Sequence, residues 1–140
     1  MEVKFKKLKP QAILPRYSHS DDAGADLFSC EEKILAPGER YLCYLGLASE
    51  FDQEYVALVW DKGGPAANAG VTMLAGVIDA NYRGEWIIVM LNTSDKPYEI
   101  KQGQKVAQVL FQKVEHPTFI EAELNQTARG EGRQGSTGLF

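Results

Sequence analysis

The apolar residues of this chain gather in short segments that glycine and proline separate. Breaks such as Pro37-Gly38 and Gly63-Gly64-Pro65 leave stretches of strand length between them. These stretches are rich in Val, Ile, Tyr, Phe and Trp, the residues favoured in strands. They cover residues 3–8, 26–30, 40–47, 55–60, 85–92, 105–114 and 118–121. The pattern predicts an all-β protein.

Two of these segments, residues 55–60 and 86–91, are apolar without alternation. We therefore expect both of their faces to be covered, as in a sandwich, a barrel or an oligomer. A short helix is expected over residues 65–69, because Pro65 suits a first helical turn and Gly70 suits a helix end. A β-sandwich or jelly roll with one short helix follows.

Residues 75–86 form an apolar strand, a polar break and a second apolar strand, a pattern that predicts a β-hairpin. On residue type alone, Asp79 and Asn81 are turn formers and Tyr82 is a half-buried aromatic. From Thr127 onward the chain is rich in glycine, with four in residues 129–138. Such a tail is either a frayed terminus or a segment that wraps a phosphate with backbone N–H groups. We divide the chain into a β-domain, residues 1–126, and a flexible arm, residues 127–140.

Composition and charge limit the classes of function that this protein can have. A chain of 140 residues fits one domain, and 44% hydrophobic with 24% charged residues is typical of a globular protein. The net charge of −4 argues against nucleic acid as a partner, although a local cationic cluster can still bind a small anion. Cys30 and Cys43 are expected to be reduced core thiols. No apolar run is long enough to span a bilayer and the N-terminus lacks an apolar signal core, so we expect a cytoplasmic protein without a membrane partner.

Five segments, in order, resemble the five motifs of the trimeric dUTPases. They are residues 23–27 (Ala-Gly-Ala-Asp-Leu), 61–66 (Asp-Lys-Gly-Gly-Pro-Ala), 76–84 (Gly-Val-Ile-Asp-Ala-Asn-Tyr-Arg-Gly), 103–108 (Gly-Gln-Lys-Val-Ala-Gln) and 129–138. The resemblance implies a distorted jelly roll that forms a homotrimer with exchanged C-terminal arms. It also implies hydrolysis of dUTP to dUMP and pyrophosphate, with Mg²⁺ spanning the phosphates.

The resemblance also implies roles for particular residues. Asp79 would activate the attacking water, Gln108 would hold the α-phosphate and that water, and Asp26 would hold Mg²⁺ through coordinated waters. Tyr82 would pack on the deoxyribose and exclude a 2′-hydroxyl. Three chains would share each site: one gives the first, second and fourth motifs, another the third, and the last its arm, which closes over the phosphates. The remaining substrate-binding positions are Lys62, Gly63, Gly64, Gly76, Val77, Ile78, Arg129, Gln134, Gly135, Ser136 and Thr137.

The chain departs from the family pattern at functional positions in the second and fifth motifs, and also at Ala25 in the first and Asn81 in the third, which carry no assigned catalytic role. The second motif normally reads Pro-Arg-Ser-Gly, so Lys62 keeps the charge without the planar fork and Gly63 lacks a hydroxyl. A lost donor to a charged group is worth roughly 1.5–3 kcal/mol, which predicts a slower enzyme. Gln134 stands where phenylalanine usually stacks on uracil, which predicts a raised KM or looser base selection.

Two alternatives are kept. A related family deaminates dCTP with a glutamate on the strand after the third motif, but Val89 stands at that position here. The other alternative is a dUTPase-like nucleotide-binding or regulatory protein with low turnover, which the changes at Lys62, Gly63 and Gln134 motivate.

Overall fold

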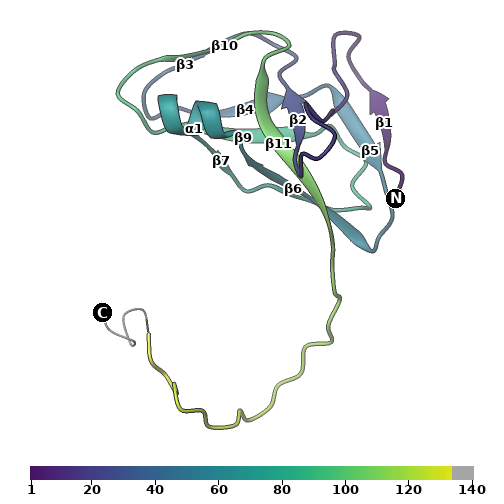
Figure 1. Cartoon of the computed structure of the whole chain (residues 1–140), viewed down its shortest axis with the longest axis vertical. Helices are drawn as coiled ribbons and strands as arrows, with labels where there is room; N and C mark the ends of the chain where they lie inside the picture. The colour runs from purple at the N-terminus through teal and green to yellow at the C-terminus, as the bar shows by residue number, and fades with distance from the viewer. Residues whose placement is uncertain (134–140) are drawn as a thin grey trace.

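The computed structural model describes residues 1–133, which form eleven strands and one short helix (Figure 1). In chain order the elements are β1 (Lys4–Lys7), β2 (Ala25–Phe28), β3 (Lys33–Leu35), β4 (Arg40–Tyr44), β5 (Leu47–Glu50), β6 (Tyr55–Asp61), α1 (Gly63–Ala69), β7 (Val71–Leu74), β8 (Val77–Ile78), β9 (Ile87–Asn92), β10 (Tyr98–Ile100) and β11 (Lys105–Lys113). The prediction of an all-β fold with one short helix is confirmed.

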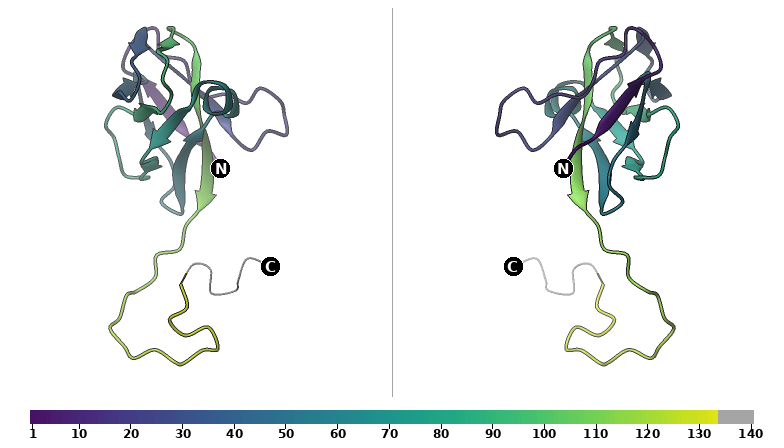
Figure 2. Two further views of the ribbon diagram at one scale, coloured as in Figure 1. Left: turned by 90° about the vertical axis from the view of Figure 1, so that its left-hand side faces the viewer. Right: turned by 90° about the vertical axis from the view of Figure 1, so that its right-hand side faces the viewer.

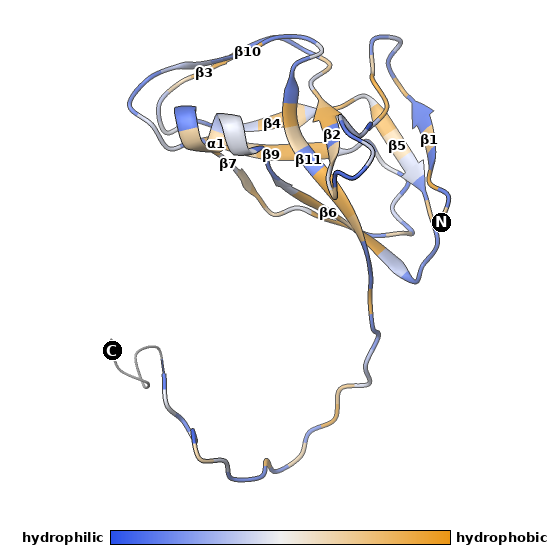
Figure 3. Ribbon diagram, viewed as in Figure 1, coloured by the Kyte–Doolittle hydropathy of each residue, from blue (hydrophilic) through white to orange (hydrophobic). Residues whose placement is uncertain are grey.

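The strands pair into four antiparallel sheets (Figures 1 and 2). The larger two have the orders β2-β11-β6-β8 and β4-β9-β7, and the smaller two are the pairs β1-β5 and β10-β3. Residues from both larger sheets, including Leu27, Val109, Ile88 and Met90, belong to one buried apolar cluster. The core therefore lies between the two larger sheets, as in a sandwich, and Figure 3 shows the apolar colouring along β2, β9 and β11.

The helix α1 begins two residues before the expected start at Pro65 and ends as expected at Gly70, whose φ of 62° is left-handed. Its seven residues are far fewer than a membrane span needs. Within residues 1–133, no helix is long and apolar enough to cross a membrane.

Several predicted strands differ from the observed ones. The segment 40–47 is two strands because Gly46 breaks it, with φ of 67° and a Cβ position that would lie 2.7 Å from Cys30 Sγ. Residues 118–121 form no strand. Within residues 1–133, burial alternates along β6 and β9, so one face of each strand is buried and the other is only partly covered.

The predicted hairpin over residues 75–86 is wrong. Its first strand, β8, pairs with β6, whereas β9 pairs with β4 and β7 in the other large sheet. Gly76 explains the first pairing: its carbonyl accepts a hydrogen bond from Val59 N at 2.8 Å, and a Cβ there would lie 2.6 Å from Val59 O. The segment therefore crosses from one sheet to the other, with a turn between.

Cys30 and Cys43 are free and buried, as predicted. The Cys30 thiol donates to Leu45 O at 2.7 Å, and Cys43 Sγ lies 3.7 Å from Ser29 Oγ. Burial raises the pKa of the Cys43 thiol to about 11, which keeps it protonated.

The chain leaves the body of the protein after β11. The last backbone hydrogen bond to the body runs from Val114 N to Glu54 O at 2.9 Å. Residues 115–133 then extend away from the sheets (Figures 1 and 2). Three large apolar side chains on this extension, Phe119, Ile120 and Leu124, are 80–91% exposed. Such exposure is unfavourable in water and is relieved when another surface covers this extension.

Candidate functional site

A buried carboxylate, that of Asp26, contacts two lysines near the β2 edge of the sheet β2-β11-β6-β8. Asp26 is 2% exposed, and its Oδ1 lies 2.5 Å from Lys62 Nζ. Its Oδ2 lies 2.6 Å from Lys105 Nζ and accepts a hydrogen bond from Ser18 Oγ at 2.8 Å. Burial raises the pKa of Asp26, but the hydrogen bonds from Lys105, Lys62 and Ser18 outweigh it and lower the pKa to about 2. We call these four residues the Asp26 cluster; its formal charge is +1.

The local sequence places each member of the Asp26 cluster. Asp26 lies on β2, and its backbone pairs with Arg16 on one side and with Gln108 on the other. Lys62 is the N-cap residue of α1, and Lys105 begins β11. Because β11 pairs with β2 on one side and, on the other, with β6, which ends just before Lys62, two lysines distant in the sequence reach the same carboxylate.

Gln108 lies beside this cluster and is held from two sides. Its Nε2 donates to Asp61 O at 2.9 Å. Gly24 leaves room for its amide, because a Cβ at Gly24 would lie 2.5 Å from Gln108 Oε1. The Asp61 carboxylate in turn accepts hydrogen bonds from Thr72 Oγ1 at 2.9 Å and Met73 N at 2.6 Å. This chain of contacts fixes the end of β6 against β7.

Gly63 and Gly64 follow Lys62 as the first two residues of α1 and are exposed. A Cβ built at either position meets no atom within 4 Å. Their backbones therefore face open space, where N–H groups of a helix start have no intrahelical partner.

A second group of residues surrounds Asp79. Tyr82 N donates to Asp79 O at 3.0 Å, which closes the predicted turn. Tyr82 Oη donates to Glu85 O at 3.0 Å, and the ring lies over Gly84, where a Cβ would overlap it. Asp79 is exposed and Tyr82 is 42% exposed. Both line a cavity of about 220 Å³ together with Val77, Ile78, Glu85, Trp86 and Ile87.

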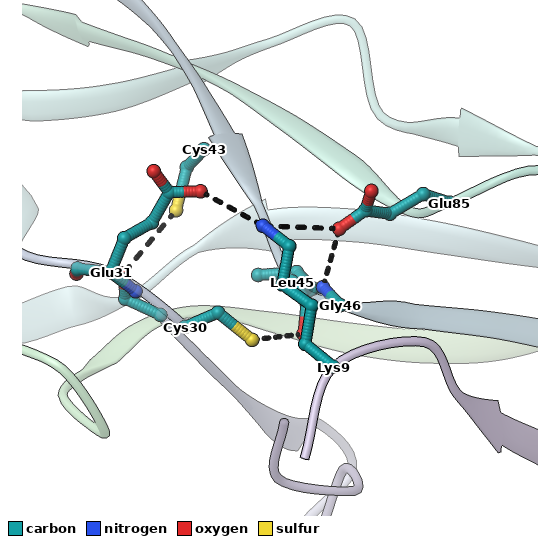
Figure 4. A network of polar contacts seen from close by, with 8 residues as sticks. Lys9, Cys30, Glu31, Cys43, Leu45, Gly46 and Glu85 are labelled. Atoms are coloured by element: carbon teal, nitrogen blue, oxygen red, sulfur yellow. Dashed lines mark hydrogen bonds and ion pairs between the residues drawn. The ribbon is translucent and has the colours of Figure 1, made fainter. Parts of the chain in front are cut away.

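Glu85 anchors this turn to the body of the protein (Figure 4). Its carboxylate accepts a hydrogen bond from Gly46 N at 2.8 Å, and Lys9 Nζ lies 3.8 Å from it. Lys9 Nζ also lies 3.5 Å from Glu31. The next residue, Trp86, donates its backbone N–H to Leu47 O at 2.8 Å. The turn that presents Asp79 therefore ends on a rigid support.

The two groups lie far apart in one chain. In the sheet β2-β11-β6-β8 the register aligns Gln108 with Asp26 on one side and with Trp60 on the other. Ile78 pairs with Ala57, which lies three residues before Trp60 on β6. At about 4.8 Å between strands and about 3.3 Å per residue, Asp26 and Ile78 are roughly 15–20 Å apart. The structure thus gathers Asp26, Lys62 and Gln108 at one place, and Gly76, Val77, Ile78, Asp79 and Tyr82 at another.

The remaining predicted positions lie on the arm. Arg129 is exposed, and its Nε donates to Gly132 O at 3.1 Å within a local turn. Gln134, Gly135, Ser136 and Thr137 lie outside the described residues.

The Asp26 cluster fits a divalent cation only in part. A carboxylate is the ligand type that Mg²⁺ prefers, but both oxygens of Asp26 already have an ammonium partner. Among residues 1–133, no group of three or more His, Cys, Asp or Glu side chains converges to hold a metal. A metal at Asp26 therefore needs further ligands from elsewhere and competes with the two lysine ammonium groups for the carboxylate.

Three residues that hold the candidate site together were not identified from the sequence. Lys105 and Ser18 complete the Asp26 cluster, and the Asp61 carboxylate ties β6 to β7. The position of Lys105 inside the fourth motif was a usable signal. Ser18 lies in a polar stretch, and no pattern marks it.

Comparison with known proteins identifies similar chains over nearly the whole length. The family model described as dUTPase matches residues 10–138. The deoxyuridine 5′-triphosphate nucleotidohydrolase of Thermobifida fusca is 42% identical, over 99% of this chain and 79% of that protein. A mutant dUTPase of Staphylococcus bacteriophage 80alpha, solved with dUpNHpp, is 25% identical with a TM-score of 0.91 and 99% of both chains covered.

A further solved structure shares the fold. It is a mutant dUTPase from phage phi11 of S. aureus, 23% identical with a TM-score of 0.84, covering 91% of this chain and 100% of that chain. In that protein the structure reveals the coordination of a structural Mg(II) ion.

Proposed function

Since the chain belongs to the dUTPase family, we propose that it hydrolyses dUTP to dUMP and pyrophosphate. The observation that carries this proposal is the position of Asp79, an exposed carboxylate on the rim of the cavity that the Tyr82 ring also lines. A carboxylate in this position can orient a water and accept its proton as the water attacks phosphorus. The rigid support behind the turn keeps that carboxylate in place.

The cavity beside Asp79 is proposed to hold the nucleoside. Tyr82 packs its ring on the deoxyribose and leaves no space for a 2′-hydroxyl. Backbone groups of Gly76, Val77 and Ile78 pair with the uracil edge, which selects uracil over cytosine because their donor patterns are opposite. Exposure of 42% for Tyr82 in the single chain supports a role in contacting something beyond its own core.

The phosphates are proposed to lie against the other group. Lys62 supplies positive charge, Gly63 and Gly64 supply backbone N–H groups from the open start of α1, and Gln108 holds the α-phosphate and the attacking water. Asp26 is the residue that would hold Mg²⁺ through coordinated waters. When bound with the triphosphate, Mg²⁺ neutralises charge on the phosphate oxygens.

We propose that the active protein is a homotrimer whose sites are shared. The separation of roughly 15–20 Å between the two groups supports this, because Asp79 and Gln108 are both proposed to contact the attacking water and cannot do so from such distant positions in a single chain. An apolar row across β4, β9 and β7 also supports it. Leu42, Val89 and Leu74 are aligned by register, and Leu42 and Leu74 are 46% and 38% exposed. Covering such a row favours association.

In the proposed trimer, one chain contributes the Asp26 group, a second contributes Asp79, and a third contributes its arm. The exposed side chains of Phe119, Ile120 and Leu124, on the extension that leads into the arm, support docking of that extension on a neighbour. Arg129 closes over the β- and γ-phosphates, and Gln134, Gly135, Ser136 and Thr137 complete the lid in this proposal.

The test is pyrophosphate release from dUTP, dTTP, dCTP and UTP, with and without Mg²⁺. We expect dUTP to be preferred strongly, UTP to be refused, and the Asp79→Asn variant to lose turnover while it still binds dUpNHpp. Equal use of UTP would contradict the role of Tyr82. Tight binding of dUpNHpp by the wild type without release of pyrophosphate from dUTP would instead support the low-turnover binding protein.

A further inference from the structure

The Asp26 carboxylate is buried and already pairs with two cationic side chains, so a metal ion would meet positive charge there. In the structure it is 2% exposed and each oxygen contacts one ammonium group, Lys62 on Oδ1 and Lys105 on Oδ2. Ser18 Oγ takes a further position on Oδ2. An ammonium within hydrogen-bond distance takes one of the acceptor positions of that oxygen, and its positive charge repels a cation brought to the other position.

Lys62 is the member of this cluster that can leave. Within residues 1–133 its ion pair is the only polar contact of Oδ1. Lys105 and Ser18 both hold Oδ2, and Ser18 also accepts a hydrogen bond from Lys105 at 2.6 Å. The Lys62 side chain is 29% exposed and stands at the open start of α1, next to Gly63. A polyanion arriving there offers its ammonium a new partner without disturbing the other half of the cluster.

We propose that Lys62 competes with the divalent cation for Asp26. In the free protein the Lys62 ammonium holds Oδ1 and keeps the metal out, and a bound triphosphate draws Lys62 onto its oxygens and releases Asp26 to the metal. Binding of the cation and of the nucleotide are then coupled, each strengthening the other. This inference rests on the proposed function, since it places the triphosphate beside Lys62.

The experiment measures Mn²⁺ binding to the full chain without nucleotide, by the electron paramagnetic resonance of free Mn²⁺. We expect the wild type to bind weakly and Lys62→Met to bind at least about tenfold more tightly, because a unit charge beside the carboxylate is gone. Lys62→Arg keeps the ion pair and binds like the wild type. Lys101→Met is the matched control for net charge, since Lys101 is 69% exposed and pairs with Glu99 at 3.9 Å.

Two further measurements decide the interpretation. Adding Asp26→Asn to Lys62→Met abolishes the gain, and adding dUpNHpp raises the Mn²⁺ affinity of the wild type by a larger factor than that of Lys62→Met. The inference is overturned if Lys62→Met gains no more than Lys101→Met, or if the gain survives Asp26→Asn. Mn²⁺ binding to the free protein requires no turnover, so a failure to hydrolyse dUTP is a separate result that counts against the proposed function.

Discussion

Restoring a hydroxyl at Gly63 should make this chain a faster enzyme. Gly63 is the first residue of α1, it is exposed, and a Cβ there meets no atom within 4 Å. Its φ is outside the left-handed region, so serine can take the same backbone conformation. Gly63→Ser therefore adds a donor beside the proposed phosphate position without displacing a neighbour.

The size of the gain follows from the hydrogen bond that is added. A bond to a charged group contributes roughly 1.5–3 kcal/mol, and ordering the serine side chain offsets part of it. We expect kcat/KM for dUTP to rise about tenfold, which corresponds to about 1.4 kcal/mol. Steady-state release of pyrophosphate under substrate-limited conditions measures this ratio directly.

Gly63→Ala is the matched control. Both substitutions stabilise the start of α1, because glycine is the weaker helix former by about 0.5–1 kcal/mol. Only serine adds a donor, so alanine should raise the melting temperature without raising kcat/KM. If the two variants show the same kcat/KM, or if serine lowers it, the placement of Gly63 at the phosphates is refuted.

Three other outcomes are expected. Removing residues 129–140 should leave the oligomer intact, as measured by sedimentation. It should reduce kcat at least about a hundredfold, because Arg129 is no longer present to contact the phosphates. Full activity of the truncated protein would contradict the proposal that these residues close over the phosphates. The pKa of Asp26 is lowered from 3.8 to about 2, so its contribution to stability is present above pH 3.8 and is lost as the pH falls through about 2. The difference in unfolding free energy between the wild type and Asp26→Asn should therefore shrink by about 2 kcal/mol in urea titrations over that range, and a constant difference would contradict the ion pairs. Because burial raises the pKa of Cys43 to about 11 and also raises that of Cys30, iodoacetamide at pH 8 should label neither thiol by mass spectrometry until the protein unfolds; rapid labelling of the native protein would count against their burial.

Much of the β-structure could be predicted because it depends on residue types and chain breaks within short stretches of the sequence. The long strands β6, β9 and β11 combine β-branched and other large apolar residues with a glycine near an end. The shorter strands β3, β7, β8 and β10 have only two to four residues, too few for a periodic pattern to stand out. They exist because a partner strand offers backbone groups to pair with, and the residues themselves do not specify that partner.

The segment containing Asp79 also has a local feature that could be predicted and a long-range feature that could not. Its turn residues were recognisable from Asp79 to Tyr82, since such residues favour turns wherever they occur. That its two flanking strands enter different sheets could not be read from them, because the choice depends on the close approach of Gly76 to Val59, seventeen positions earlier in the chain.

By itself, the sequence determined the strand-rich composition, the short helix, the reduced thiols and the order of the motif residues, because local propensity and residue chemistry act within a few positions. The tertiary structure alone decided what Asp26 contacts. Its partners Ser18, Lys62 and Lys105 are separated by tens of residues. They meet only because β11 pairs with β2 on one side and, on the other, with β6, which ends just before Lys62. Pairing of distant strands is cooperative and sets which charges become neighbours, and in a buried site those neighbours decide whether a carboxylate meets a metal or a lysine.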